Sequence, residues 1–238
     1  MKQKKHNRFL AAFLAVAMML QVLPMLAFAA EDMPLTKGQA KVVSTGIVYD
    51  SVMKAVKAAV SGDTIELGEG NYTLYKVDGT GTTTGTTTGT TKDKDLTFVG
   101  QGTGKTAWTI GGEVPNPDYY GTEYNGDYSF DGAGTVTFKN MTLRSGNVDY
   151  LGFIRANKTV VEDCVINGET CYWGYKSAEF KNTTFNAPSG RYALWTYSSP
   201  VMTFDGCTFN ADGRVINVYT DYGLSLIHIS EPTRLALI

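Results

Sequence analysis

Four short blocks between residues 138 and 209 share one pattern. They read Phe138-Lys-Asn-Met-Thr-Leu143, Val161-Glu-Asp-Cys-Val-Ile166, Phe180-Lys-Asn-Thr-Thr-Phe185 and Phe204-Asp-Gly-Cys-Thr-Phe209. The first residues of successive blocks are 23, 19 and 24 positions apart. A repeat of about twenty residues is typical of a solenoid, in which each repeat buries its apolar side only against its neighbours.

The third position of each block holds a residue type that tolerates a left-handed backbone at low cost. These structural corners are Asn140, Asp163, Asn182 and Gly206. One such residue bends the chain sharply, and the Thr, Val and Phe residues around it favour strands. A repeat of this length is too short for a strand–helix–strand unit of about 30 residues. The blocks therefore predict an all-β repeat of short strands.

The inward positions of the blocks follow from the same pattern. We expect parallel strands in which the first block residues are aligned and buried, namely Phe138, Val161, Phe180 and Phe204. A second inward row is expected at Met141, Cys164, Thr183 and Cys207. The alternative architecture is a β-sandwich with accidental similarity between the blocks.

An entry segment precedes the blocks. Residues 50–60 form the one helical pattern, with Asp50 or Ser51 as its cap and Val52, Val56, Ala59 and Val60 on one face. Gly62-Asp-Thr-Ile-Glu-Leu67 and Gly70-Asn-Tyr72 follow. This segment and the blocks together resemble the right-handed parallel β-helix of the pectin-lyase-like superfamily. The resemblance covers about residues 51–222 and implies an N-terminal helix that caps the open apolar end of the solenoid.

Both ends of the sequence differ from the repeat region. Residues 1–30 have the basic start, apolar run and small-residue cleavage site of a signal peptide, which predicts a secreted or cell-surface bacterial protein without a membrane span after cleavage. Leu224-Ser-Leu-Ile-His-Ile-Ser-Glu-Pro-Thr-Arg234 matches, at all eleven residues, the translation of a common transposase sequencing adapter. We therefore expect 224–238 to be a non-native tail that frames no consistent repeat, and the natural chain to be cut near Gly223.

The remaining residues 31–223 form one predicted domain. It contains a Gly/Thr-rich loop at 79–91 and a loop excursion at 111–132. Its 16 lysines and arginines against 22 aspartates and glutamates leave a net charge of −6, which disfavours nucleic acid as a partner. The oligomeric state is left open.

The domain contains no histidine, because His6 lies in the leader and His228 in the tail. This excludes histidine-based catalysis and histidine-bound metals. The acidic residues are scattered, so we predict no catalytic residue, no metal site and no cofactor, with calcium on exposed carboxylates as the open alternative. Cys164 and Cys207 occupy equivalent block positions two repeats apart, about 9–10 Å, too far for a disulfide. We expect buried free thiols, and Cys171 has no evident partner.

One row of residues is a candidate ligand-binding site. Counting from the first residue of each block, and correcting for the shorter second repeat, aligns Phe153, Tyr172, Trp195 and Tyr219. Alternate positions hold aliphatic residues suited to the interior, which leaves the aromatic row outside. Exposed aromatic ladders suit the apolar faces of sugars. Arg155, Tyr197 and Asp221 flank the row. The alternative is that the row faces inward or is covered by the excursion at 111–132.

Three functions are compatible with these features. The first is a noncatalytic exported or cell-surface module that binds a polysaccharide or surface glycan, or acts as an adhesin. The second is a polysaccharide lyase or glycoside hydrolase of the pectin-lyase-like fold whose catalytic repeats are missing; pectate lyases and noncatalytic surface proteins both belong to that superfamily. The third is a structural spacer in a larger surface protein. Enzymatic activity is therefore undecided by the sequence, although the lack of catalytic motifs disfavours it.

Overall fold

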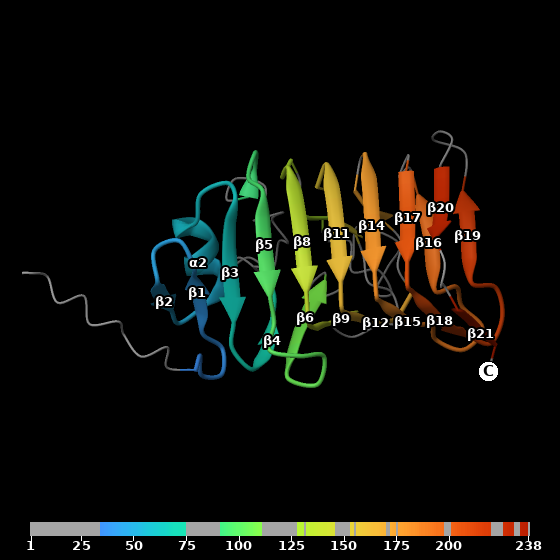
Figure 1. Cartoon of the computed structure of the whole chain (residues 1–238), viewed down its shortest axis with the longest axis horizontal. Coiled ribbons are helices and arrows are strands. Elements are labelled where there is room, and N and C mark those ends of the chain that lie inside the picture. The colour runs from blue at the N-terminus through green and yellow to red at the C-terminus, as the bar shows by residue number, and fades with distance from the viewer. Residues whose placement is uncertain are drawn as a thin grey trace, which may run out of the picture. The chain divides into compact units, whose positions relative to one another are not determined.

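The computed structural model describes residues 34–74, 91–110, 128–130, 132–145, 153–154, 156–169, 172–174, 176–197, 201–219, 226–230 and 234–237. Leu35–Ile238 forms one compact unit, to which every element named below belongs. The unit is predominantly β, with long parallel sheets, and its described residues include one helix (Figure 1).

The first sheet has nine strands and carries the opening positions of the sequence blocks. Its order is β2 (Ile47–Tyr49), β1 (Ala40–Val42), β3 (Asp63–Leu67), β5 (Leu96–Val99), β8 (Thr135–Lys139), β11 (Lys158–Glu162), β14 (Ser177–Lys181), β17 (Val201–Asp205) and β20 (Leu226–Ser230). Every pairing from β3 to β20 is parallel, whereas β1 is antiparallel to both β2 and β3. Figure 1 shows these strands side by side along the unit.

The second sheet has seven strands, all parallel. In chain order they are β4 (Gly70–Tyr72), β6 (Thr106–Ile110), β9 (Thr142–Ser145), β12 (Val165–Asn167), β15 (Thr184–Asn186), β18 (Thr208–Ala211) and β21 (Arg234–Leu237). The remaining strands, here called the third strand set, form two smaller parallel sheets: β7 (Tyr128–Ser129), β10 (Phe153–Ile154) and β13 (Tyr172–Trp173), then β16 (Leu194–Tyr197) and β19 (Ile216–Tyr219). From β8 to β19 the chain visits the first sheet, the second sheet and the third strand set in turn.

The predicted inner row of the first sheet is confirmed. Phe138, Val161, Phe180 and Phe204 are direct register partners and are fully buried. The row continues toward the N-terminus through Phe98 and Ile65. The rings of Phe180 and Phe204 stack at 5.2 Å, and Phe180 also meets Phe185 of the second sheet at 5.1 Å. Contacts of this kind join the inner faces of the two sheets into one core.

The second predicted inward row is also confirmed, since Met141, Cys164, Thr183 and Cys207 are all buried. Cys164 and Cys207 are free thiols, as the repeat spacing predicts. Thr183 and Cys207 both point back to the preceding repeat: Thr183 Oγ1 donates to the Val161 carbonyl at 3.3 Å, and Cys207 Sγ to the Phe180 carbonyl at 3.4 Å. Burial raises the pKa of Cys164 to about 12 and also raises the pKa of Cys207.

The corners between the first and second sheets have a left-handed backbone. The φ angles are 56° at Asn140, 53° at Asp163, 47° at Asn182 and 63° at Gly206. The corner side chains also contact each other, because Asn182 Nδ2 donates to Asp163 Oδ1 at 3.1 Å. A side chain at position 206 would also be disfavoured by a close contact, because an added Cβ would lie 2.7 Å from Asn182 Oδ1.

The helix α2 spans Val52–Ala58 and contacts β1, β2 and β3. Ser51 caps its start by accepting from the Lys54 amide, and the Lys94 ammonium binds the Val56 and Ala59 carbonyls at its end. Val52, Ala55 and Val56 form the buried face of the helix. The expectation that Val60 belongs to the apolar face was wrong. The helix stops before Val60, and this side chain is 65% exposed.

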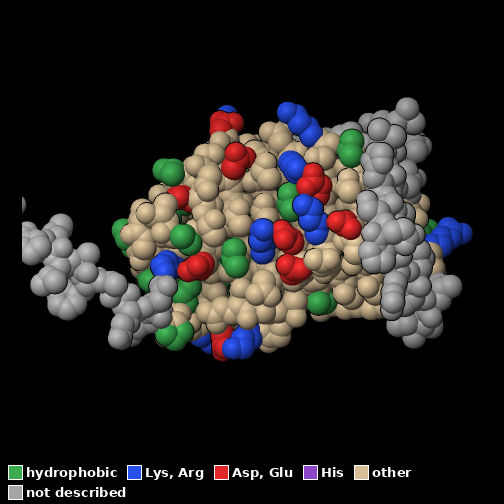
Figure 2. Space-filling model, in the orientation of Figure 1, with side chains coloured by type: hydrophobic (Ala, Val, Ile, Leu, Met, Phe, Trp, Pro, Cys, Tyr) green, Lys and Arg blue, Asp and Glu red, His purple; other side chains and the backbone are tan. Residues whose placement is uncertain are grey.

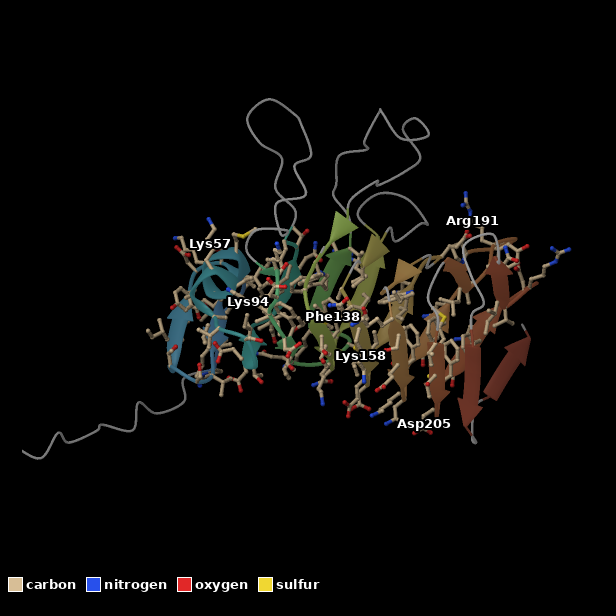
Figure 3. All side chains as sticks on the ribbon, turned by 90° about the horizontal axis from the view of Figure 1, so that it is seen from above. Lys57, Lys94, Phe138, Lys158, Arg191 and Asp205 are labelled. Atoms are coloured by element: carbon tan, nitrogen blue, oxygen red, sulfur yellow. The ribbon has the colours of Figure 1, made fainter. Side chains whose placement is uncertain are left out.

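The outer face of the first sheet carries charges of both signs. Lys139 Nζ lies 2.6 Å from Glu162, and Lys158 Nζ lies 2.5 Å from Glu179. The row Lys139, Glu162, Lys181 and Asp205 alternates in sign from strand to strand. Figure 2 shows the mixed group of basic and acidic side chains on this face. Figure 3 shows Phe138 among the strands, with Lys158 and Asp205 on the side of the outer face.

The prediction that residues 224–238 frame no consistent repeat was wrong for the described parts of that segment. β20 and β21 extend the first and second sheets in register, with Ile229 beside Phe204 and Leu235 beside Phe209. The physical reason is that an open sheet edge accepts any strand of alternating apolar residues, such as Ile227 and Ile229. The adapter origin of the tail stays a prediction, checked by reading independently cloned genomic DNA, in which codons 224–234 are expected to be absent.

Three segments named in the sequence prediction lie wholly or largely outside the described residues. They are the leader 1–30, the Gly/Thr-rich segment 79–91 apart from Thr91, and the excursion 111–132 apart from residues 128–130 and 132. The described end of the excursion supplies β7 and the buried Phe130, whose ring lies 5.7 Å from that of Phe98.

Candidate functional site

The predicted aromatic row falls on the third strand set. Phe153 in β10 and Tyr172 in β13 are direct register partners, as counting from the blocks predicts. Tyr128 in β7 extends this row on the other side of Phe153. Tyr128 was missed because it lies at the end of the excursion, where no block sets the count. Three successive strands thus carry an aromatic residue at the same register position.

The second half of the predicted row is wrong in register. Trp195 pairs with Asn217, and Tyr219 pairs with Tyr197. The connection from the second sheet to β19 is shorter than the connection to β16, because Ile216 follows Phe204 by 12 positions whereas Leu194 follows Phe180 by 14. A count from the blocks therefore misplaces Tyr219 along its strand. In addition, β13 and β16 belong to different sheets.

For the predicted site residues themselves, the structure describes mainly the backbone. Arg155 and Asp221 lie outside the described residues, and so do the side chains of Phe153, Tyr172, Trp195, Tyr197 and Tyr219. The residues next to the aromatic positions are described more fully. Ile154, Trp173 and Leu194 are all buried in the core.

Trp173 anchors the third strand set to the first sheet. Its ring meets Phe180 edge-on at 5.3 Å, and its side chain is 1% exposed. Its Nε1 has no hydrogen-bond partner in the described part of the chain. Gly174 follows it at a φ of +124°, and an added Cβ there would lie 2.9 Å from the Ser177 carbonyl oxygen. The chain therefore turns tightly from β13 back into the first sheet.

The segments that follow β12, β15 and β18 of the second sheet carry a polar cluster that the sequence prediction missed. Arg191 Nη1 lies 3.4 Å from the carboxylate of the buried Glu169, and Arg214 Nη1 donates to the Tyr192 hydroxyl at 3.0 Å. Figure 3 shows Arg191 on the side opposite Lys158. The two partners of each contact are one repeat apart in the sequence, so each contact joins equivalent turns of neighbouring repeats.

Asp212 belongs to the same turns. It accepts hydrogen bonds from the Ser189 hydroxyl at 2.6 Å and from the Gly190 amide at 3.0 Å. These two donors lower the pKa of the Asp212 carboxyl from its usual value. Asp212 is thus engaged in holding a turn.

The described residues include no group of three or more His, Cys, Asp or Glu side chains placed to hold a metal ion. Within the same residues, no helix is long and apolar enough to cross a membrane. No protein-family model, no curated protein sequence and no solved structure matches this chain.

Proposed function

We propose that this chain is an exported, noncatalytic module with the right-handed parallel β-helix fold, similar to the noncatalytic surface proteins of the pectin-lyase-like superfamily. We further propose that it binds a surface glycan along the third strand set. One observation carries the proposal of a binding site: aromatic residues occupy equivalent register positions on successive strands, first in Tyr128, Phe153 and Tyr172, then in Tyr197 and Tyr219.

The spacing of these residues supports an extended glycan as the ligand. Neighbouring parallel strands lie about 4.8 Å apart, which is close to the length of one sugar unit. A sugar chain that runs across the strands can then stack on one ring after another. Strand alternation supports outward rings, because the neighbours Ile154 and Trp173 are buried. Arg191 and Arg214 on the adjoining turns are exposed donors for sugar hydroxyls.

The β-helix assignment rests on the strand order. Each repeat from β8 to β19 places one strand in the first sheet, one in the second and one in the third strand set, and the pairs between these repeats are parallel. Connections between parallel strands of one sheet are almost always right-handed. The helix α2 at the first strands supports the role of a cap.

The proposed location and partners follow from the sequence. The leader at 1–30 directs the chain out of a bacterial cell, and a net charge of −6 in residues 31–223 favours neutral glycans over nucleic acids. The proposal includes no cofactor. Calcium bridging between exposed carboxylates and a glycan is tested by the same assay.

The experiment is calorimetry on glycans first selected with an array, using the full chain with and without added calcium. Tyr172→Ala and Tyr197→Ala, one from each aromatic row, are compared with Lys158→Ala, a control on the outer face of the first sheet. One lost aromatic stack is expected to weaken binding by about fivefold, since it contributes roughly 1 kcal/mol. The control is expected to bind as the parent chain does.

Two outcomes contradict the proposal. Equal binding by Tyr172→Ala, Tyr197→Ala and the parent chain removes the site from the third strand set. Turnover of a polysaccharide by the purified chain replaces the noncatalytic module with a polysaccharide lyase or hydrolase. Thermal unfolding of each variant, followed by circular dichroism, shows whether a loss of binding reflects a loss of fold.

A further inference from the structure

The N-terminal edge of the first sheet is an exposed apolar strand. β2 is the outermost strand in the sheet order, and β1 is its only partner among the described strands. The strand reads Ile47-Val-Tyr49 and contains no charged residue. Ile47 is 51% exposed and Val48 is 45% exposed. Exposed edges without charge are the usual sites at which one chain adds a strand to another.

The backbone of Val48 faces this open edge. In β1, the Val43 amide donates to Thr64 and the Gln39 carbonyl accepts from Gly68, so alternate residues from 39 to 43 face β3. Ala40 and Val42 therefore face β2, where their register partners are Tyr49 and Ile47. Because backbone direction alternates along a strand, the N–H and C=O of Val48 point away from β1. One donor and one acceptor are left at the centre of the edge strand.

Ile47 marks the end of the inner apolar row. It pairs in register with Val42, and Val42 pairs with Ile65, both fully buried. The same row continues through Phe98 and Phe138 into the core. Ile47 is thus a core position that lacks a neighbour on one side, which explains its exposure. A further strand at this edge would complete the row.

We propose that two copies of this chain associate through antiparallel pairing of their β2 strands, with Val48 on the two-fold axis. In this register the N–H and C=O of Val48 bond the C=O and N–H of the partner's Val48, and Ile47 lies opposite the partner's Tyr49. Such a contact is isologous, so it closes as a dimer. The two first sheets then form one continuous sheet.

The charges beside the edge permit this pairing. Val48 lies in the outer row with Lys41 and Glu66, which neutralise each other at 3.6 Å. Asp50 follows β2 and is paired with Lys54 at 2.7 Å. The two copies of Asp50 would lie four positions apart along the strands, about 13 Å, which exceeds the screening length at physiological salt. No like charges face each other across the axis among the described residues of this edge.

The first test is molar mass by light scattering over micromolar to millimolar concentrations of the full chain. A mass that rises to twice the monomer value is expected. Val48→Pro removes the outward N–H, and proline is tolerated at that position of an edge strand. Loss of both hydrogen bonds and of close strand approach is expected to weaken association by at least about tenfold. Val48→Thr keeps the N–H and is the matched control, expected to associate as the parent does.

The second test is covalent. Partners in a hydrogen-bonded antiparallel pair have Cα atoms about 5.5 Å apart, within disulfide range. Val48→Cys in a Cys171→Ser background is expected to form a disulfide-linked dimer under mild oxidation, whereas Ser44→Cys in the β1–β2 turn is not. A monomer at every concentration, association that survives Val48→Pro, or equal cross-linking at 44 and 48 would each overturn the proposal. Unchanged circular dichroism of Val48→Pro shows that its fold is intact.

Discussion

The first two sheets and the third strand set are built from the same repeats, yet they differ in regularity. In the first sheet, residues that pair between β8, β11, β14 and β17 are 23, 19 and 24 positions apart in the sequence, as the blocks are. The paired residues of the second sheet have the same separations in the sequence. In the third strand set the spacing changes, because the partners Leu194 and Ile216 are closer in the sequence than Phe180 and Phe204 of the same two repeats. The third strand set also breaks into two separate sheets.

The difference shows how the connections control register. A one-residue corner with positive φ joins the first sheet to the second, so it transmits the register of one sheet to the other. Connections of varying length lead into the third strand set, whereas those out of β10, β13 and β16 each span three residues, so the register is reset at the entry connections. Such variable segments are where proteins usually carry binding function, on a scaffold kept regular elsewhere. The proposed glycan site lies in the variable part.

Phe180→Ala is expected to have the largest effect on stability, because it removes a core side chain from the two regular sheets. Phe180 is fully buried and contacts the rings of Trp173, Phe185 and Phe204. Its truncation is expected to lower the free energy of unfolding by about 3–5 kcal/mol. The matched change in the third strand set is Ile216→Ala at a half-buried position, for which we expect about 1–2 kcal/mol. Chemical denaturation measures both, and equal losses would remove the energetic distinction between the regions.

The pH dependence of stability probes the second inward row. Because burial raises the pKa of Cys164 to about 12, the unfolded chain loses this proton near pH 9 while the folded chain keeps it. The unfolded state is then favoured increasingly between about pH 9 and 12, by up to about 1.4 kcal/mol per pH unit from this thiol. The control is Cys164→Thr, which copies the Thr183 arrangement without a titrating thiol.

The parent chain is expected to lose stability more steeply than Cys164→Thr over this pH range. The difference isolates Cys164, since Cys207 and Tyr72, whose pKa values are also raised by burial, titrate in both proteins. Without prior reduction, Cys164 and Cys207 are also expected to react with a thiol reagent only after unfolding. Parallel pH profiles of the two proteins, or rapid labelling of the folded chain, would contradict the buried row.

Asn182→Ala examines the corner that transmits the register. Asn182 has a φ of 47° and donates to Asp163, so alanine is expected to cost about 1–2 kcal/mol through backbone strain and the lost hydrogen bond. Asn182→Gly relieves the strain and is expected to cost less. Unfolding curves of the two variants compare them directly; a glycine variant weaker than the alanine variant would argue against the corner role.

Lys158→Ala on the outer face of the first sheet is expected to have the smallest effect. Lys158 and Glu179 are about one-third exposed, and surface ion pairs contribute about 0–1 kcal/mol. The free energy of unfolding is measured in low and in high salt. A loss well above that range would show that the charged outer row stabilises the sheets as much as the inner one does, whereas a loss unaffected by salt would show that Lys158 acts through packing and not through its charge.

The sequence was a good guide wherever one residue type recurs at one position. The aligned row of Phe138, Val161, Phe180 and Phe204, together with the two free thiols, follows directly from the spacing of the blocks. The candidate site was predicted only in part. Counting paired Phe153 with Tyr172, but it misplaced Tyr219, because the lengths of the turns cannot be read from the blocks.

Other features left no signal in the sequence pattern. Arg191 and Glu169 lie in different repeats and meet only because two turns stack on each other. The antiparallel hairpin of β1 and β2 precedes the repeats, and its short strands show no alternation long enough to predict pairing with β3. Val60 was placed on the helical face because the apolar pattern does not mark where so short a helix stops.

The sequence by itself therefore determined the all-β repeat, its inner rows and the positions of its corners, because a buried alternating strand and a left-handed corner each restrict residue type at a single position. The tertiary structure alone decided which residues of the third strand set share a register position, which turns touch, and which strand is left as the edge. Those outcomes depend on the path that connections of unequal length take around a common core. Many different sequences can form the same connection, so the sequence of a connection does not determine its path.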